Sequence, residues 1–232
     1  MKKASVLSEL LLPQGFVKKQ GVFLRNCLNE SVQVIQLVPD SFSRSNVTVS
    51  VFSIYQEQVR TWIRAPKTFP ANYQVTAFEA RSRGFYPLSD SEETEILKTT
   101  VIPTLNHISS QNQLLSLMRS LDAAAFGDGY LLNENRIYPA LAANQYEYEE
   151  VGRIIEAILQ QHRDAENSMK KHLRSSEFAD YCSSSRMKER SMIQIKAWIE
   201  NGETHLIEQF LECAKTNNLS ALAENGIARF EA

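Results

Sequence analysis

The sequence has few glycines, and none of them forms a recognisable nucleotide-binding or catalytic loop. Its 8 glycines are scattered along 232 residues, so neither GxGxxG nor GxxxxGK[ST] occurs, and no GxSxG motif is present. Such motifs place backbone N–H groups around a phosphate or expose a nucleophilic serine at a sharp turn. The sequence therefore gives no support to a dinucleotide-dependent enzyme, a P-loop NTPase or a serine hydrolase.

Metal-ligand spacings are also lacking. The chain has 4 histidines, which are far apart, and it contains no CxxC or HxxxH pair. A metal site needs several His, Cys or carboxylate ligands that converge. We therefore expect no metal and no cofactor, and the lack of a convergent catalytic set favours a protein that is not an enzyme.

Cysteines and long apolar runs are scarce. Cys27, Cys182 and Cys213 are odd in number and widely separated, which is typical of free thiols in a reducing compartment. No apolar run approaches the ~18 residues needed to cross a bilayer. Polar residues interrupt the stretch Val6–Leu12, so we interpret it as an amphipathic helix and not as a signal sequence. These features predict a cytoplasmic protein with no membrane segment.

Charge is present in near balance but is unevenly distributed. The net charge is −2, with eleven basic and six acidic residues in 1–90, against fourteen and twenty-one in 91–232. The asymmetry favours two parts that attract each other across their own interface, and a basic surface for an acidic partner is the alternative.

The order of sequence patterns predicts an α+β fold, with strands first and helices later. A helix ends near Gly15, and runs rich in β-branched and aromatic residues predict four strands, namely Gly21–Cys27, Val32–Val38, Val47–Tyr55 and Tyr73–Ala80. Short connections favour antiparallel neighbours. Residues 1–90 are expected to form this helix and sheet, and residues 91–232 a helical region packed on the sheet as one compact unit.

Two side-chain patterns predict how the sheet faces its surroundings. Val47, Val49 and Val51 alternate with Thr48 and Ser50, which predicts one face against the core and one near solvent. In the first strand, Phe23 and Arg25 share a face. If Phe23 is buried, we expect Arg25 at the edge of the sheet or paired with a carboxylate.

The helical region has its strongest periodic signal at residues 148–172. Apolar positions and two histidines alternate at spacings of three and four residues, at Tyr148, Val151, Ile155, Ile158, His162, Ala165, Met169 and His172. Such a heptad seam predicts a helix that packs against other helices of the same chain, with His162 inside the contact. A homodimer through the same seam remains the alternative.

The most notable polar cluster is basic and aromatic. It comprises Arg60, Trp62, Arg64 and Lys67 before the fourth predicted strand, and Arg81, Arg83, Phe85 and Tyr86 after it. Cations beside aromatic faces suit a phosphate-bearing ligand or single-stranded nucleic acid. The small number of cations and the neutral balance of the chain disfavour general nucleic-acid binding.

Residues 15–25 read GFVKKQGVFLR, a GF-x-KK element leading into F-x-R; residues 32–36 read VQVIQ, and Ile54-Tyr55 ends the third predicted strand. With these motifs, the first 55 residues or so resemble the opening of a bacterial family called domain of unknown function 4304. The resemblance implies an α+β fold and a bacterial cytoplasmic origin. The family has no characterised activity and supplies no site, and a role as an immunity-type or accessory protein is what such small domains suggest.

These observations favour a non-enzymatic module that binds another protein. The alternative is a ligand-binding domain or enzyme that acts on a phosphate-bearing substrate through Arg60, Trp62, Arg64, Arg81, Arg83 and Tyr86. Weak nucleic-acid binding is a third hypothesis.

The cysteine pattern gives a direct test of the predicted compartment. Alkylation of the denatured protein without reductant should add three labels by mass spectrometry, because all three thiols are expected to be free. The addition of a single label would reveal a disulfide and contradict the cytoplasmic prediction.

Overall fold

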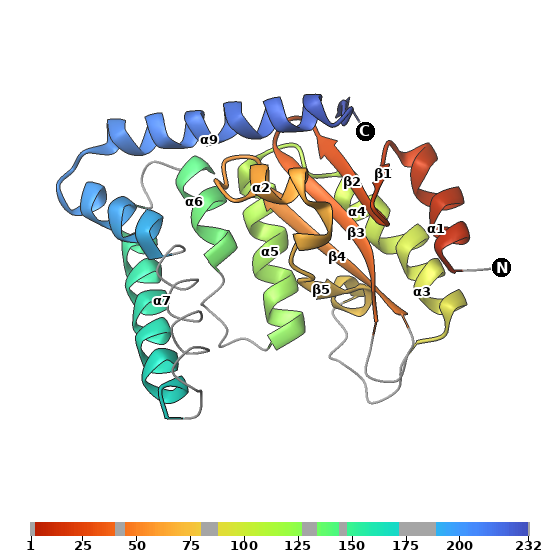
Figure 1. Ribbon diagram of the computed structural model, residues 1–232, viewed down its shortest axis with the longest axis horizontal. Coiled ribbons are helices and arrows are strands. Elements are labelled where there is room, and N and C mark those ends of the chain that lie inside the picture. Colours follow the sequence, from red (N-terminus) through yellow and green to blue (C-terminus); the bar gives the residue numbers. More distant parts are fainter. Residues whose placement is uncertain are drawn as a thin grey trace.

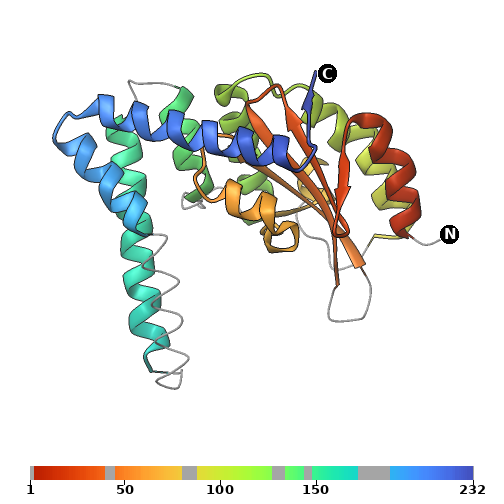
Figure 2. The ribbon, with the colours of Figure 1, turned by 45° about the horizontal axis from the view of Figure 1, so that its top comes forward.

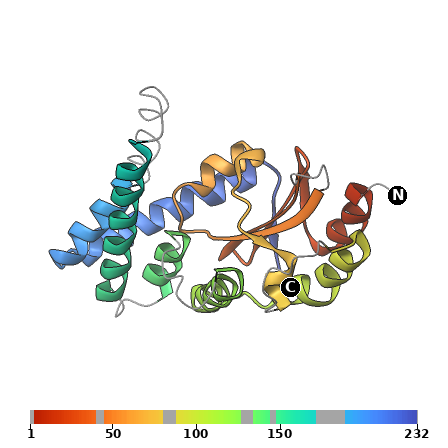
Figure 3. The same ribbon diagram turned by 90° about the horizontal axis from the view of Figure 1, so that it is seen from below.

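The computed structural model describes residues 3–39, 45–79, 88–126, 134–143, 148–171 and 189–231. A six-stranded sheet has helices on both faces (Figure 1, Figure 3), so the predicted α+β class is confirmed. The strands are β1 (Val17–Lys19), β2 (Val22–Cys27), β3 (Ser31–Pro39), β4 (Ser45–Ser53), β5 (Tyr73–Gln74) and β6 (Arg229–Phe230).

Helices precede, interrupt and follow this sheet. The α-helices are α1 (Lys3–Leu11), α2 (Val59–Arg64), α3 (Asp90–Ile96), α4 (Ile102–Asn106), α5 (Gln111–Phe126), α6 (Ile137–Ala143), α7 (Tyr148–Met169) and α9 (Thr204–Glu224). Residues 189–200 are also helical. Short 3-10 helices occupy η1 (Leu12–Gln14), η2 (Pro66–Thr68), η3 (Val75–Glu79) and η5 (Glu134–Arg136), and η4 (Leu97–Val101) is a π turn. None of the helices in the described ranges is long and apolar enough to span a membrane.

The sheet brings the first and last strands of the described chain to one edge of β2. Strands β1 to β5 are antiparallel neighbours in sequence order, and the short connections predicted this for β2, β3 and β4. Strand β3 occupies one edge of β2, and the other edge is shared. Here β1 pairs with Val22–Leu24, and β6 runs parallel to β2 beside Asn26 and Cys27.

Gly15 turns the chain out of the first helical segment, as predicted. Its φ of 78° lies in the left-handed region, which favours glycine. A Cβ added at this position would lie 2.2 Å from Cδ2 of Phe230. Both the conformation and the close approach of β6 therefore require glycine.

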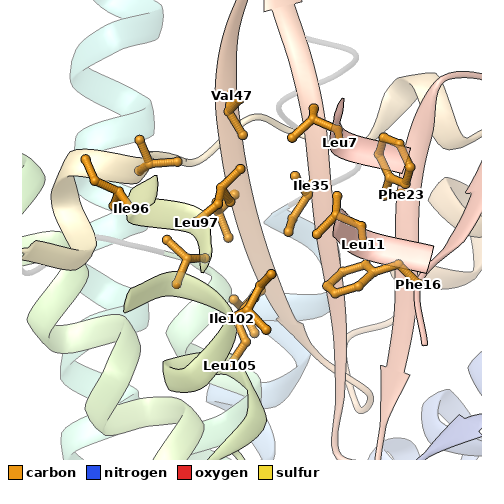
Figure 4. Close-up of a cluster of buried hydrophobic side chains, with 14 of the residues drawn as sticks. Leu7, Leu11, Phe16, Phe23, Ile35, Val47, Ile96, Leu97, Ile102 and Leu105 are labelled. Carbon is orange, nitrogen blue, oxygen red and sulfur yellow. The ribbon is translucent and has the colours of Figure 1, made fainter. Parts of the chain in front are cut away.

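Both faces of the sheet are covered by helices (Figure 3). One face, with Phe23, Ile35 and Val49, forms an apolar cluster with α1, α3 and α4 (Figure 4). The opposite face, with Leu24, Val34, Phe52 and others, packs against α2 and α9. The sheet is thus the middle layer of the molecule.

The prediction that one face of β4 lies near solvent is wrong. Every residue from Val47 to Ser53 is buried, including Thr48 and Ser50. The hydroxyl of Ser50 donates to the carbonyl oxygen of Pro70 at 2.7 Å, which satisfies it without water. Small hydroxyl side chains can therefore occupy a face of the sheet that helices cover. The polarity of Thr48 and Ser50 wrongly indicated a solvent-facing side.

The fourth predicted strand is much shorter than expected. Only Tyr73 and Gln74 pair with β4, and the chain then winds into the 3-10 helix η3. Within the described residues, the predicted strand Tyr73–Ala80 is therefore wrong after Gln74. A high β propensity does not by itself provide a neighbouring strand to pair with.

The helical region begins with a capped helix. Ser89 and Glu92 form a capping box at the start of α3. The π turn η4 then precedes α4, whose first turn contains Pro103. Proline has no N–H to donate to the preceding turn, which accounts for the change from regular α-helix to a π turn before it.

A third apolar cluster joins α6, α7, the helical residues 189–200 and α9. From the predicted seam, Val151, Ile155 and Ile158 are buried here. His162 lies at the margin, with its Nδ1 3.2 Å from Oε1 of Glu189 and its side chain 22% exposed. Met169 is 39% exposed. Among the described residues, the intramolecular packing predicted for the seam is therefore found along the first half of α7, and His172 lies outside the described residues.

Arg25 is fully buried on the face of the sheet that carries Phe23. Its Nε and Nη2 donate to Oε1 of Gln33 at 2.8 and 2.6 Å, and its Nη1 donates to the carbonyl oxygen of Gln14 at 2.8 Å. The guanidinium carbon lies 4.4 Å from the ring centres of both Phe16 and Phe230.

No described carboxylate forms an ion pair with Arg25. The expectation of an edge position or a carboxylate partner is therefore wrong: an amide oxygen, a carbonyl oxygen and two aromatic faces take that place. Burial lowers the pKa of Arg25 to about 10, and the Cys27 thiol opposes this shift. Gln33 in turn donates from Nε2 to the carbonyl oxygen of Leu105 at 2.9 Å, which ties the sheet to α4.

We expect Phe230→Ala to lower the free energy of unfolding by about 2 kcal/mol, because it removes an aromatic face from a buried cation and loosens β6. Arg229→Ala in the same strand is the matched control, because its side chain is 51% exposed. Urea denaturation compares the two variants, and equal stabilities would contradict the role given to Phe230.

Ile155→Asp should lower the free energy of unfolding by at least about 3 kcal/mol, since it places a carboxylate in an apolar contact. Ala157→Asp adds the same group on the exposed side of α7 and should cost less than about 1 kcal/mol. Thermal unfolding and light scattering together check this. A folded Ile155→Asp variant that only changes from dimer to monomer would show that the seam is an oligomer interface.

Candidate functional site

The structure places the predicted basic and aromatic residues in different settings. Arg60 is exposed on α2. Arg64 is also exposed, and its Nη2 lies 3.2 Å from Oε2 of Glu224 on α9. The cations of α2 thus lie on an outer surface, where an ion pair contributes at most about 1 kcal/mol to stability. Arg81, Arg83, Phe85 and Tyr86 lie outside the described residues.

Trp62 packs on the sheet. Its ring centre lies 4.9 Å from that of Phe52 and 5.7 Å from that of Phe69. These contacts belong to the apolar cluster under α2. Trp62 therefore holds α2 on the sheet with one side of its ring.

Trp62 also borders a small cavity between α2, the η5–α6 segment and the helical residues 189–200. The cavity measures about 30 Å³ and is lined by Gln56, Gln58, Trp62, Glu134, Tyr138 and Met192. A metabolite pocket usually measures ~300 Å³ or more. This cavity can therefore hold only a few atoms of a ligand.

Two of the residues that line the cavity have a buried amide oxygen without a hydrogen-bond partner. These oxygens are Oε1 of Gln56 and Oε1 of Gln58. Their amide nitrogens are engaged: Nε2 of Gln56 donates to Oδ1 of Asn135 at 2.8 Å, and Nε2 of Gln58 donates to the hydroxyl of Tyr138 at 3.4 Å. Both oxygens expose less than 1 Å² of surface, so a water-sized group in the cavity does not contact them.

The hydroxyl of Tyr138 is buried, and two carboxylates act on it. Burial raises the pKa of Tyr138 to about 12; donation from Gln58 opposes this shift, and the carboxylates of Glu57 and Glu134 reinforce it. Glu57 is held near the helical residues 189–200 by Ser191, whose hydroxyl donates to its Oε2 at 2.8 Å.

No known protein-family model, curated protein or solved structure matches this chain. The resemblance to the domain of unknown function 4304 family therefore stays a prediction.

A second candidate site is the distal part of α7, which we define as residues 159–169. Figure 2 shows α7 extending away from the sheet, past the helices that pack on its first half. In this distal part, Ala165 is half-buried and Met169 is exposed, and neither belongs to an apolar cluster of the described residues. The seam pattern thus continues beyond the region where it is buried.

Metal binding has no candidate in the described ranges, where no three His, Cys, Asp or Glu side chains are grouped to hold an ion. The thiol of Cys27 is free and buried, and burial raises its pKa although Arg25 opposes this. Cys213 is free and exposed, and Cys182 lies outside the described residues.

Sequence reasoning missed most of the cavity. It selected Trp62 for its cationic neighbours, whereas the groups that join Trp62 at the cavity are Gln56, Gln58 and Tyr138. Two glutamines before a short helix carry no motif, and Tyr138 is about eighty residues further along the chain. Only the tertiary fold brings these side chains together.

Proposed function

We propose that this chain is a non-enzymatic module that binds another protein through the distal part of α7. The observation that carries the proposal is the continuation of the heptad seam past the last buried position. Ile158 is 2% exposed, whereas Met169 is 39% exposed in the same row of side chains. A helix with such a row presents side chains at spacings that a partner helix or groove accepts.

The length of α7 supports this assignment. It has 22 residues, and its buried residues, Val151, Ile155 and Ile158, all lie in the first half. A helix of this length extends about 33 Å, because each residue adds about 1.5 Å. The first half anchors the helix, and the second half carries the seam away from the sheet.

The surrounding charges favour a protein partner over nucleic acid. The exposed surface of the distal part mixes basic and acidic side chains, such as Arg163 and Asp164. Nucleic-acid binding needs a surface with a clear excess of positive charge. In keeping with the resemblance at its N-terminal segment, we place the protein in the bacterial cytoplasm as an accessory or immunity-type factor.

A charge on the seam should remove partner binding. Met169→Asp puts a carboxylate into the proposed contact, while Asn167→Asp adds the same charge two residues away, on nearly the opposite side of the helix. Both positions are exposed, so both variants should keep the melting temperature of the parent protein.

The measurement is cross-linking capture from the native host, with a photoreactive group at position 165, quantified by mass spectrometry. We expect Met169→Asp to reduce the captured partner at least tenfold and Asn167→Asp to leave it unchanged. Equal capture by both variants would refute this surface. A dimer in light scattering that Met169→Asp dissociates would instead identify a second copy of this chain as the partner.

A further inference from the structure

We infer that Asn201 is a modification site, at which the side-chain amide reacts with the backbone nitrogen of Gly202 and is converted to aspartate and isoaspartate. The sequence contains two Asn–Gly pairs, Asn201–Gly202 and Asn225–Gly226. The two pairs have the same local conformation, but the fold restrains them differently. This difference assigns the reaction to Asn201, and it does not depend on the proposed function.

The reaction needs no partner other than water. The Gly202 nitrogen forms a bond to Cγ of Asn201, the bond between Cγ and the amide nitrogen breaks, and ammonia leaves with the proton of the glycine N–H. Water then hydrolyses the five-membered imide at one of its two carbonyl carbons, which gives aspartate or isoaspartate. Glycine favours the ring closure, because it has no Cβ to hinder the approach of its nitrogen.

Both pairs end a helical segment with the same hydrogen-bond pattern. Gly202 has a φ of 70° and Gly226 a φ of 69°, which the lack of a Cβ allows. The N–H of Gly202 donates to the carbonyl oxygen of Ile199 at 3.1 Å, and the N–H of Gly226 to that of Ala223 at 3.0 Å. These bonds are typical of a Schellman cap. Each cap must therefore open before its glycine nitrogen can reach the asparagine side chain.

The cap around Asn225 is restrained by its own side chain and by a buried apolar residue. Nδ2 of Asn225 donates to the carbonyl oxygen of Ala221 at 2.9 Å, which holds the amide on α9. Ile227 follows the glycine, is 2% exposed and packs in the apolar cluster that joins the sheet to α2 and α9. Opening of this cap would pull Ile227 out of that cluster and displace β6, which comes directly after it.

The cap around Asn201 has neither restraint. Asn201 is exposed, and within the described ranges its side chain has no hydrogen-bond partner. The residue that corresponds to Ile227 is Glu203, whose N–H donates to the carbonyl oxygen of Trp198 at 2.8 Å but whose side chain is polar and only half-buried. Since segments with few buried apolar contacts open most readily, this cap opens more often and its asparagine reacts first.

The modification alters the joint between the helical residues 189–200 and α9 (Figure 2). Aspartate adds a negative charge at the C-terminal end of a helix, where the helix dipole and the neighbouring carboxylates of Glu200 and Glu203 disfavour it. Isoaspartate also inserts one carbon into the main chain, so the bond from Glu203 to Trp198 cannot keep its geometry. Because both helices pack on the first half of α7, the modification loosens the anchor of that helix.

The first experiment incubates the folded protein at mildly alkaline pH and follows both pairs in one digest. They fall in different tryptic peptides, residues 197–215 and residues 216–229. Mass spectrometry measures the deamidated fraction of each peptide over time, fragment spectra assign the modified residue, and an unincubated sample gives the background. We expect Asn201 to react at least tenfold faster than Asn225. Equal rates, or a faster reaction of Asn225, would overturn the inference.

Two controls separate the fold from the sequence. In concentrated urea both caps are lost, so the two rates should differ by less than about threefold. A tenfold difference that persists in urea would show that the fold does not select Asn201. Asn201→Gln keeps an exposed amide but would need a six-membered ring, so peptide 197–215 should stay unmodified and the melting temperature unchanged. Unchanged modification of this peptide in the variant would refute the assignment to Asn201.

Amide hydrogen exchange tests the proposed cause directly. The N–H groups of Glu203 and Ile227 occupy the same position in the two caps. We expect the N–H of Glu203 to exchange at least tenfold faster in the folded parent protein, because its cap opens without exposing a buried side chain. Equal exchange at the two positions, measured by NMR, would contradict the difference in opening on which the inference depends.

Discussion

The buried guanidinium of Arg25 is the constraint on which the arrangement of this fold depends. A cation removed from water is costly unless its surroundings replace the hydration, and here they do so without a described carboxylate. The substitutes come from separate parts of the chain: Gln14 after α1, Phe16 before β1, Gln33 in β3 and Phe230 in β6. Loss of any one of these segments would leave the charge partly uncompensated, so Arg25 fixes their mutual positions.

The central sheet then determines where the possible sites lie. Helices on both faces leave the sheet itself without a free surface, and function must be sought at the ends of the helices and between them. Asn218 of α9 illustrates the linkage, since its Nδ2 donates to the carbonyl oxygens of Ile54 and Gln56 at 2.7 and 2.9 Å. These bonds hold the segment after β4 in place, and that segment carries the glutamines of the cavity.

Local patterns in the sequence were sufficient for much of this architecture. Runs rich in β-branched and aromatic residues located β2, β3 and β4 to within two residues, and the capping box of Ser89 and Glu92 marks the start of α3. These signals are local, because they depend on neighbours in sequence. Strand β6 was missed because two residues have no periodicity, and the burial of Ser50 was missed because its partner, the carbonyl oxygen of Pro70, is a backbone atom. The cavity was missed for a related reason: Gln56 and Tyr138 meet only in the folded chain.

The position of β6 has a consequence for how the protein acquires its structure on the ribosome. The ring of Phe230 that covers one face of Arg25 is synthesised more than 200 residues after the arginine itself. Until that segment emerges, the nascent sheet carries an incompletely shielded cation and an unpaired stretch of the β2 edge. Contacts between such distant segments form slowly. The final closure of this sheet therefore waits for the synthesis of β6, and the growing chain must remain free of competing strands until then.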